Sequence, residues 1–300
     1  MLKIAYHPIY RHPLPLGHRF PMGKYELLHQ QLLYEGTCEP ENFFEPEIPN
    51  NKYIFLTHDA EYVSDLLNIT LDQRAARKIG FPLSELLIER ELVITDGTIK
   101  ASELALKNGI AMNIAGGTHH AFTNRGEGFC MFNDQAVGAN YLLHKNLVEK
   151  ILIVDLDVHQ GNGTAEIFRD NPNVFTFSMH GKSNYPFHKE NSDLDIPLEN
   201  ETNDDTYLSI LKKTLPKLIY EQQPDFIYYL SGVDILESDK LGKLSLSMEG
   251  CKERDRIVLE TCKSHQIPVM VSMGGGYSKD IKIIVEAHAN TFRLAQEIYF

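Results

Sequence analysis

Two aspartates and a histidine stand at alternate positions in one short stretch of this chain, at Asp155, Asp157 and His159. They directly follow an apolar run, residues 151–154, which has the composition of a buried strand. In an extended strand, side chains two residues apart point to the same face, so these three groups should converge where the strand ends. Unpaired charge is costly in a protein interior, and buried carboxylates are therefore usually paired or bound to metal. Two oxygen donors and one nitrogen donor at one point predict a transition-metal site, although a helix cap or a solvated turn fits the same spacing.

Polar residues at the ends of other apolar runs could complete this site. Asp234 follows the run at residues 226–233 and could serve as a third metal ligand. Three protein ligands leave one coordination position open for water or substrate, as in catalytic zinc sites. Asp234 could instead cap a turn. His119 and His120 follow two glycines at another strand end and suit general acid–base chemistry near neutral pH, but exposed loop histidines fit the same pattern.

Several other side chains have the chemistry to support such a site. Catalytic histidines need partners that fix their tautomer, and Asp155 and Asn162 are both available. Tyr277 follows three glycines, which would let the backbone bend around a ligand and aim the phenol at a carbonyl oxygen that gains charge, unless the residue lies on the surface. Phe129 could line an apolar channel. Cys130 beside it is expected to be a buried, unreactive thiol, because nothing adjacent would lower its pKa.

These side chains end segments that share one pattern, a short apolar run followed by polar residues. Such runs are typical of strands buried on both faces of a parallel sheet. Strands that alternate with helices favour a parallel α/β sheet, in which ligands bind beyond the carboxyl ends of the strands. We therefore expect the polar ends to meet at one edge of the sheet. The expected strand segments are residues 109–120, 151–159, 174–180, 226–234 and 268–277, and the expected helices are residues 133–147, 203–222, 247–265 and 280–298.

Two of these helices contain residues with a predicted local role, and the first hundred residues are less regular. Asp134 is a possible cap of the first expected helix, and Pro216 should kink or split the second. Residues 62–77 and 84–92 have helical composition. Residues 7–23 are rich in histidine and proline and should form a loop.

Length and composition fit one large α/β domain over residues 1–300, because 43% hydrophobic content suffices for a large core and no repeat or linker interrupts the chain. The net charge of −12 argues against direct nucleic-acid binding through phosphate contacts. The four cysteines show no C-x-x-C spacing and should be reduced thiols. Neither a signal peptide nor a run near the ~18 apolar residues of a membrane span is apparent, so we expect a cytoplasmic protein that does not enter a membrane.

Five motifs in this chain together resemble the zinc-dependent histone deacetylase family, which has the arginase–deacetylase fold. Each motif alone is weak, but all five occur in the order of that family. The variants Gln160 and Asn162 are more similar to the class IV branch and its bacterial relatives than to class I. The resemblance implies a single three-layer α/β domain with a mainly parallel central sheet flanked by helices. The motifs are GGTHHAF at 116–122, GFCMFND at 128–134, DLDVHQGNG at 155–163, YLSGVD at 229–234 and GGGY at 274–277.

The same resemblance implies an amidohydrolase with one zinc ion, held by the residues that match Asp157, His159 and Asp234. It also implies a set of catalytic side chains: a general base, a second imidazole that acts electrostatically, a partner behind each of these two rings, and an oxyanion donor. The matching residues are, in that order, His120, His119, Asn162 behind His120, Asp155 behind His119, and Tyr277.

A potassium ion near the zinc ion and a tunnel for the acyl-lysine side chain are further implications of the resemblance. The tunnel walls would include Phe129 and Tyr185, with Gly128 and Gly275 beside them. The potassium ion would be held by side chains of Asp155 and Ser178 and by backbone oxygens of Asp157, His159 and Met179.

Two positions separate this chain from related enzymes. Asn162 is an aspartate in class I members, and an amide cannot stabilise the imidazolium of His120 by charge, so a less basic His120 is expected. Binuclear manganese ureohydrolases of the same fold use a D-x-H-x-D motif, in which the last carboxylate bridges to a second metal. This chain has Gly161 at that position, which favours a single zinc ion.

The motifs leave three functions open, which differ in substrate or in whether the protein is catalytic. The first is hydrolysis of an acyl-lysine in a protein or peptide, with an acetyl group or a longer acyl chain. An acetylpolyamine amidohydrolase would share every motif. A non-catalytic acyl-lysine-binding protein is the third possibility, and the retained Tyr277 and tandem histidines argue against it, because a binder needs neither an oxyanion donor nor a base.

Overall fold

An eight-stranded sheet in which every neighbouring pair of strands is parallel forms the middle layer of the protein. The computed structural model describes all 300 residues. The strand order is β2-β1-β3-β8-β7-β4-β5-β6. The strands are β1 (Lys3–Ala5), β2 (Phe43–Phe44), β3 (Ile110–Asn113), β4 (Ile151–Asp155), β5 (Val174–Gly181), β6 (Leu194–Leu198), β7 (Phe226–Leu230) and β8 (Val269–Ser272).

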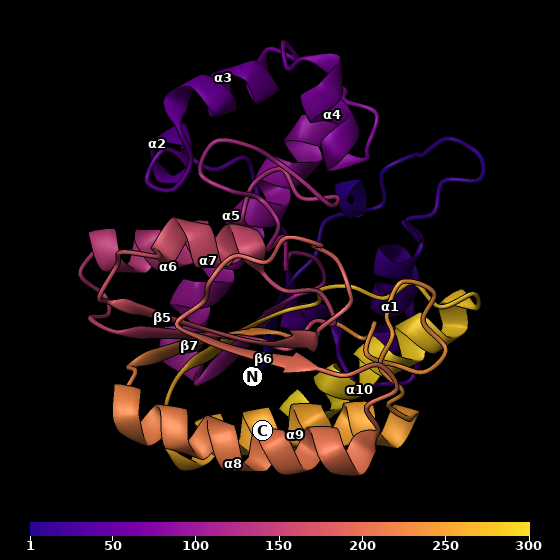
Figure 1. Ribbon diagram of the computed structural model, residues 1–300, viewed down its shortest axis with the longest axis vertical. Coiled ribbons are helices and arrows are strands. Elements are labelled where there is room, and N and C mark those ends of the chain that lie inside the picture. The colour runs from indigo at the N-terminus through magenta and orange to yellow at the C-terminus, as the bar shows by residue number, and fades with distance from the viewer.

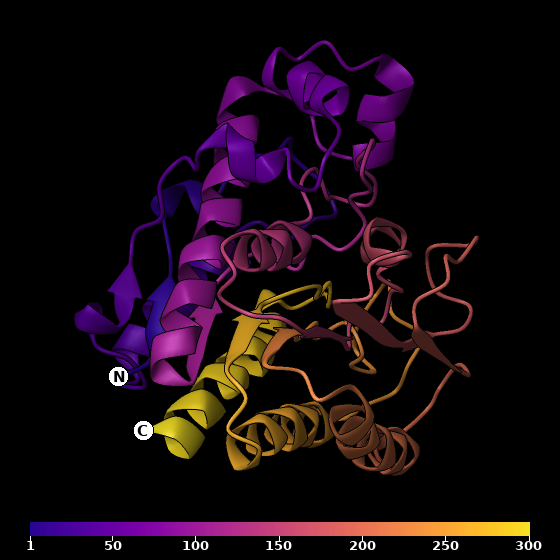
Figure 2. The same ribbon diagram turned by 90° about the vertical axis from the view of Figure 1, so that its left-hand side faces the viewer.

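Helices cover both faces of the sheet and give a three-layer α/β domain (Figures 1 and 2). On one face lie α5 (Glu85–Asn108), α6 (Asp134–His144) and α7 (Asn162–Phe168), and on the other lie α8 (Asp204–Gln222), α9 (Met248–Ser264) and α10 (Ile281–Tyr299). The helix α1 (Lys24–Tyr34) packs against α10. The three short helices at the top of Figure 1 are α2 (Asn51–Ile54), α3 (Ala60–Leu67) and α4 (Gln73–Ile79). No helix has both the length and the apolar character needed to cross a membrane.

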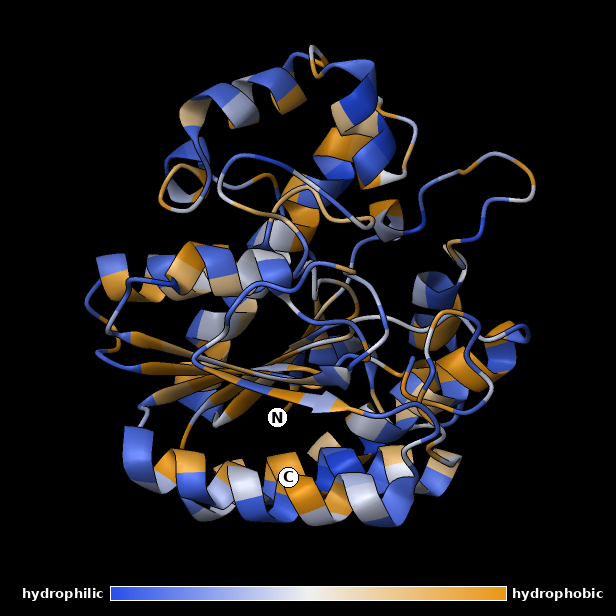
Figure 3. Cartoon of the chain, in the orientation of Figure 1, coloured by the Kyte–Doolittle hydropathy of each residue, from blue (hydrophilic) through white to orange (hydrophobic).

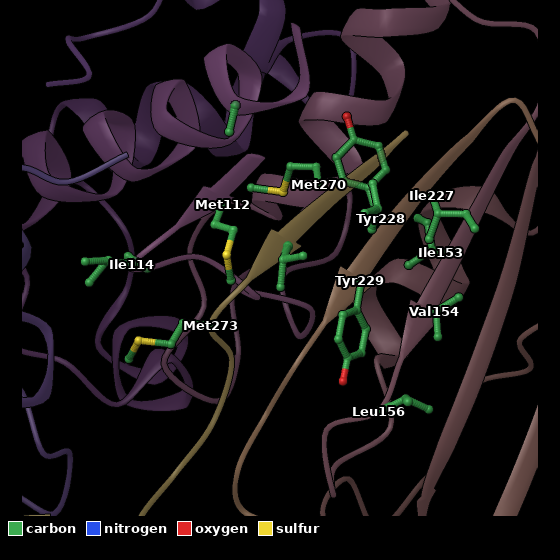
Figure 4. Packing of buried hydrophobic residues seen from close by; sticks show 14 of the residues in the cluster. Met112, Ile114, Ile153, Val154, Leu156, Ile227, Tyr228, Tyr229, Met270 and Met273 are labelled. Atoms are coloured by element: carbon green, nitrogen blue, oxygen red, sulfur yellow. The ribbon is translucent and has the colours of Figure 1, made fainter. Parts of the chain in front are cut away.

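One cluster of 78 buried hydrophobic residues, from Leu2 to Ala295, forms the core on both sides of the sheet. Hydrophobic colour dominates the strands in Figure 3, whereas the covering helices mix hydrophobic and hydrophilic residues, as amphipathic surface helices do. Two successive tyrosines of β7 point to opposite faces (Figure 4). The Tyr228 hydroxyl lies 2.8 Å from Ser102 Oγ in α5, and the Tyr229 hydroxyl donates to Asp255 in α9. The central strand is thus bonded to both helical layers.

The site is positioned by a switch in strand order between β4 and β7, which are neighbours in the sheet. From β4 the chain continues outward to β5 and β6, whereas from β7 it continues to β8 on the other side. In parallel α/β sheets, ligands bind beyond the carboxyl ends of the strands at such a switch point. The neighbouring strands β3, β8, β7 and β4 all direct their carboxyl ends to this edge.

The predicted parallel α/β fold is confirmed, and the five predicted strand segments correspond to β3, β4, β5, β7 and β8. Sequence reasoning missed β1, β2 and β6. The first two are only three and two residues long, and β6 contains Asp195 and Pro197, which interrupt the apolar pattern expected of a strand.

Several helix predictions need correction. Residues 62–77 form two helices rather than one, with a break between Leu67 and Gln73. Pro216 does not split α8, which is continuous. Asp134 is not the cap of α6, because the Asn133 side chain accepts the N–H of Ala136 at 3.1 Å and fills that role.

The helix expected at residues 84–92 extends to Asn108 as α5. Its second half was missed because polar residues break the apolar pattern. They are satisfied by tertiary contacts: Thr98 Oγ1 donates to Asp134 at 2.7 Å and accepts from Asn113 Nδ2 at 3.1 Å. Gly97 in the same turn has no room for a side chain, because a Cβ there would lie 2.6 Å from the Tyr10 hydroxyl.

Candidate active site

The backbone after β4 turns instead of continuing as a strand, which corrects the expected extended geometry. The strand ends at Asp155, and its Oδ1 accepts the N–H of Asp157 at 3.2 Å. The Oδ1 of Asp157 in turn accepts the N–H of His159 at 2.9 Å. These carboxylates therefore shape the turn that presents them, and the alternation in sequence reflects this turn and not a pleated strand.

Asp157, His159 and Asp234 meet at the switch point, and all three are buried. One potential ligand atom of each lies within 4.8 Å of the others. Nδ1 of His159 is 3.0 Å from Oδ1 of Asp157 and 3.1 Å from Oδ2 of Asp234. The remaining carboxylate oxygens accept backbone N–H groups, from Val158 to Asp234 at 2.9 Å and from Gly275 to Asp157 at 2.8 Å. Backbone N–H groups thus fix one oxygen of Asp234 and both oxygens of Asp157, and Oδ1 of Asp157 and Oδ2 of Asp234 face the His159 ring.

The two buried carboxylates of this group favour a positive charge between them. Burial and the nearby Asp157 raise the pKa of Asp234 to about 7. Although burial disfavours a charged imidazole, the two carboxylates raise the pKa of His159 to about 10. Two carboxylates and one imidazole that converge in a buried position are a typical ligand set for catalytic zinc, so the residues present fit a divalent metal ion.

Glycines let the backbone approach these carboxylates closely. A Cβ at Gly275 would lie 2.0 Å from Oδ2 of Asp234, and a Cβ at Gly232 would lie 2.2 Å from Oδ2 of Asp157. Contacts this short are not possible for real side chains, so both positions require glycine while the carboxylates keep their places.

The tandem histidines lie next to this centre with their rings 4.1 Å apart. Nδ1 of His119 is 2.6 Å from Oδ2 of Asp155, and Nδ1 of His120 is 2.6 Å from Oδ1 of Asn162, the first residue of α7. Both imidazoles are buried. The structure thus brings each predicted pair of side chains into contact.

The two imidazoles differ in basicity because their partners differ in charge. Burial opposes protonation of His119, but the Asp155 carboxylate outweighs it and raises the pKa of this ring. Burial, followed by the nearby His119 and His159, holds the pKa of His120 well below its usual value. One ring is therefore suited to remain protonated and the other to accept a proton.

Tyr277, in the loop after β8, lies beside the same group of side chains. Its ring centroid is 6.4 Å from that of His159, and its backbone N–H donates to Oδ2 of Asp239 at 2.6 Å. Burial raises the pKa of the phenol well above its usual value, so the hydroxyl stays protonated and can donate a hydrogen bond. Asp239 was not predicted, because nothing in the sequence links it to a residue 38 positions away.

A cavity of about 280 Å³ opens from these groups to the surface and is lined by Phe129, Tyr185 and Gly128 among others. Gly128 and Phe129 both have positive φ angles, +53° and +69°. A Cβ at Gly128 would lie 2.8 Å from Cδ2 of His120, so glycine is required there. The Tyr185 ring lies 4.9 Å from the His120 ring. Gly275 lines a smaller inner cavity of about 50 Å³.

The N-terminal segment contributes wall residues that sequence reasoning missed. The predicted loop at 7–23 contains a short 3-10 turn at Pro8–Tyr10 and then places Phe20 5.2 Å from the Phe129 ring and 5.9 Å from the Tyr277 ring. Lys24, at the start of α1, is fully buried and donates to the Gly274 carbonyl at 3.0 Å. Burial lowers its pKa to about 8. No pattern in the sequence indicated these contacts.

Of the residues predicted for potassium, Asp155, Ser178 and Met179 lie on the neighbouring strands β4 and β5, whereas Asp157 and His159 lie in the turn after β4. Asp155 of β4 and Ser178 of β5 are register partners, and both are buried, as is Met179. Ser178 Oγ lies 3.0 Å from Nδ1 of His180. Oxygen donors of this kind suit hard cations.

Two further positions agree with the sequence argument. A Cβ at Gly161 would lie 2.3 Å from Oδ2 of Asp155, so the chain has no room there for the bridging carboxylate of a binuclear site. Cys130 is a buried free thiol whose pKa is raised well above its usual value by burial, which disfavours a thiolate nucleophile.

The sequence profile of the Histone deacetylase domain matches residues 18–292, so this chain belongs to the histone deacetylase family. An uncharacterized protein of Picosynechococcus sp. is 45% identical over 99% of both chains. Histone deacetylase 2 of Arabidopsis thaliana is 29% identical over 92% of this chain and 74% of its own length. The acetoin utilization protein AcuC of Staphylococcus aureus is 27% identical over 92% of this chain and 76% of its own length.

Solved structures share the fold. The crystal structure of an HDAC homolog complexed with SAHA superposes with a TM-score of 0.83 and 26% identity, over 97% of this chain and 82% of that one. The crystal structure of the HDA15 HD domain gives a TM-score of 0.80 at 18% identity, over 96% and 89% of the two chains, and supports the fold alone. The predicted family is confirmed, and family membership indicates a hydrolase of the deacetylase type.

Proposed function

We propose that this protein is a zinc-dependent deacylase that removes acetyl or longer acyl groups from the side-chain amine of lysine, with residues 1–300 acting as one catalytic domain. The observation that carries the proposal is the inner cavity, where Asp157 and His159 of a three-donor metal centre lie beside two imidazoles of opposite basicity. A binding protein would need the cavity but not this difference between the histidines.

Asp157, His159 and Asp234 would hold the zinc ion through the oxygens and nitrogen that face one another. When bound, zinc supplies Lewis acidity toward the amide carbonyl and lowers the pKa of a coordinated water. The glycines at 232 and 275 keep the two carboxylates in place by allowing close backbone approach. One mononuclear centre is proposed, because Gly161 leaves no ligand for a second ion.

The histidine pair would move the protons. Nδ1 of His120 donates to the Asn162 amide oxygen, which leaves Nε2 as the proton acceptor. The low pKa of His120 keeps the ring neutral before reaction, so it can take a proton from water and later transfer one to the leaving amine. His119, protonated beside Asp155, would stabilise negative charge that develops in the cavity.

The remaining groups would bind and orient the substrate. The Tyr277 hydroxyl would donate to the carbonyl oxygen as it gains negative charge. Phe129 and Tyr185 offer aromatic surface to the methylene chain of an acyl-lysine, and Gly128 keeps this passage open beside His120. Aromatic and apolar surfaces suit an alkyl stem, whereas the polar groups at the floor suit its amide.

A potassium ion is proposed behind the zinc centre, held by Asp155, Ser178 and backbone oxygens of Asp157, His159 and Met179. The register pairing of Asp155 with Ser178 supports this assignment. Activity measured in potassium salt, sodium salt and a bulky ammonium salt at equal ionic strength tests it. Equal rates in all three salts would remove potassium from the proposal.

Purified protein incubated with an acetyl-lysine peptide tests the main proposal, with acetate release measured alongside metal content. We expect turnover by protein that holds about one zinc ion per chain, loss of turnover after chelation, and recovery after zinc is restored. A control with Asp234→Asn should neither hold zinc nor turn over the peptide. Metal-independent hydrolysis, or full zinc loading without any hydrolysis of acyl-lysine peptides, contradicts the proposal.

A further inference from the structure

Cationic side chains surround the opening of the cavity in front of the proposed site. Apart from two active-site histidines, the charged residues that line it are Arg19, Lys78 and Lys243, and no aspartate or glutamate is among them. All three are exposed. The chain as a whole carries 41 acidic and 29 basic residues, so this local excess of positive charge runs against its overall composition.

Each cation is held at the opening by a specific contact. The Arg19 guanidinium lies over the Phe129 ring, 4.9 Å from its centroid. The Lys243 ammonium donates to the Ser183 carbonyl at 3.2 Å. Neither of these cations has a carboxylate partner, so their charges remain available to a substrate.

Two carboxylates that contact residues lining the opening, Glu127 and Asp239, are already occupied. Glu127 accepts from the Tyr185 hydroxyl at 2.9 Å and pairs with Arg125 at 3.1 Å and Lys78 at 3.6 Å. Because two cations surround one carboxylate, Glu127, Arg125 and Lys78 together carry a net positive charge. Asp239 accepts three backbone N–H groups and does not line the cavity. No carboxylate among the residues that line the cavity is therefore present to attract an ammonium group.

The position of these cations decides which part of a substrate meets them. The floor of the cavity reaches His120, His159 and Tyr277, so a reacting amide lies there and the rest of the substrate lies at the opening. An acyl-lysine enters by its side chain, and the residues beside it in the peptide stay at the surface. An acetylated polyamine carries its remaining ammonium groups through the same opening.

We propose that Arg19, Lys78 and Lys243 form a cationic rim that selects acyl-lysine within acidic protein or peptide segments and disfavours acetylated polyamines. The inference rests on the deacylase function proposed above. Charges around a concave opening with low-dielectric walls focus the electric field and raise the local concentration of oppositely charged substrates. The same field repels ammonium groups, and salt screens both effects.

Turnover of matched substrates by the zinc-loaded full-length protein tests the rim. The substrates are three acetyl-lysine peptides of equal length, flanked on both sides by glutamate, glutamine or lysine, and N-acetylspermidine. At low salt we expect kcat/KM to fall in that order and to be lowest for N-acetylspermidine. The values for the glutamate and lysine peptides should differ about tenfold or more. The differences should arise mainly in KM. They should shrink at high salt, because the screening length falls from about 10 Å at 0.1 M to about 3 Å at 1 M.

A double variant, Arg19→Gln with Lys243→Gln, should lose most of the preference for the glutamate peptide. Its matched control, Lys107→Gln with Lys213→Gln, removes the same charge from exposed residues outside the cavity and should keep the preference. Loss of the preference in both double variants would assign it to net charge and overturn the role of the rim.

Binding measurements separate this inference from the proposed function. Fluorescent versions of the same peptides are titrated into the Tyr277→Phe protein, and their dissociation constants should follow the same order. That order without turnover by the wild-type protein would support the rim and contradict the deacylase. Turnover of all peptides with equal kcat/KM, or fastest turnover of N-acetylspermidine, would contradict the rim and leave the hydrolase intact.

Discussion

Replacing Asn162 with aspartate tests the proposal that His120 is the neutral base and His119 the protonated imidazole. Asn162 Oδ1 lies 2.6 Å from Nδ1 of His120, so Asn162→Asp places a carboxylate at that contact with little change in shape. The neutral form of His120 is the proposed base. Activity therefore requires a pH above the pKa of this ring, and it is lost as the pH falls below that pKa. A carboxylate stabilises the charged ring, raises its pKa, and should move the acid limb of the pH–rate profile to higher pH.

The expected size of this change follows from the neighbouring pair. Asp155 faces His119 at the same 2.6 Å, and it raises the pKa of that ring in spite of burial. An opposite charge within about 4–6 Å typically changes a pKa by about 1 to 3, and each unit corresponds to about 1.4 kcal/mol. We therefore expect the acid limb of kcat/KM to move up by roughly one to three pH units.

The assay is kcat/KM for one acetyl-lysine peptide from acid to neutral pH, with zinc content measured at each pH. Asn162→Ala is the matched control, because it removes the acceptor without adding charge. It should lower the rate at every pH and should not move the limb upward. An unchanged limb in Asn162→Asp, at wild-type zinc content, would refute the assignment of His120 as the base whose partner sets its basicity.

Three further substitutions have expected outcomes. Tyr277→Phe removes the proposed oxyanion donor and should lower kcat about 100- to 1000-fold at unchanged zinc content, so near-normal turnover would exclude the tyrosine from the mechanism. Gly275→Ala places a methyl group 2.0 Å from Oδ2 of Asp234 and should weaken zinc binding, as measured by competition with a chelator; wild-type affinity would show that the loop can move away. Arg254→Met leaves the fully buried Asp255 without its partner at 2.8 Å and should destabilise the fold by about 3–5 kcal/mol in denaturant unfolding, whereas a loss below 1 kcal/mol would contradict a buried ion pair.

The centre of the fold could be predicted because its signals are local. The strands β4 and β7 are continuous apolar runs, and the polar residues after them mark the edge where ligands bind in a parallel sheet. The same reasoning gave the wrong local geometry for Asp157 and His159, because alternation in sequence cannot distinguish a pleated strand from a turn stabilised by its own carboxylates.

Other parts of the site depend on contacts that no local pattern encodes. Lys24 reaches the Gly274 carbonyl across 250 positions of sequence, and Phe20 meets Phe129 only after the N-terminal segment has folded along the cavity. Loops without periodicity give no indication of which side chain will point inward. The cationic rim likewise becomes visible only when residues from three separate segments are placed around one opening.

The helix α9 does not line the cavity, but its side chains contact the backbone next to Asp157 and Asp234. Arg254 in this helix donates to the carbonyl of Gly232 at 2.6 Å, two residues before Asp234, and to the carbonyl of Leu156 at 3.2 Å, one residue before Asp157. Asp255 beside it accepts a hydrogen bond from the Tyr229 hydroxyl. A slight displacement of α9 would therefore alter the spacing between Asp157 and Asp234. Substitutions on its outer surface, far from any substrate, offer evolution a means of adjusting turnover without altering a single residue that the substrate touches.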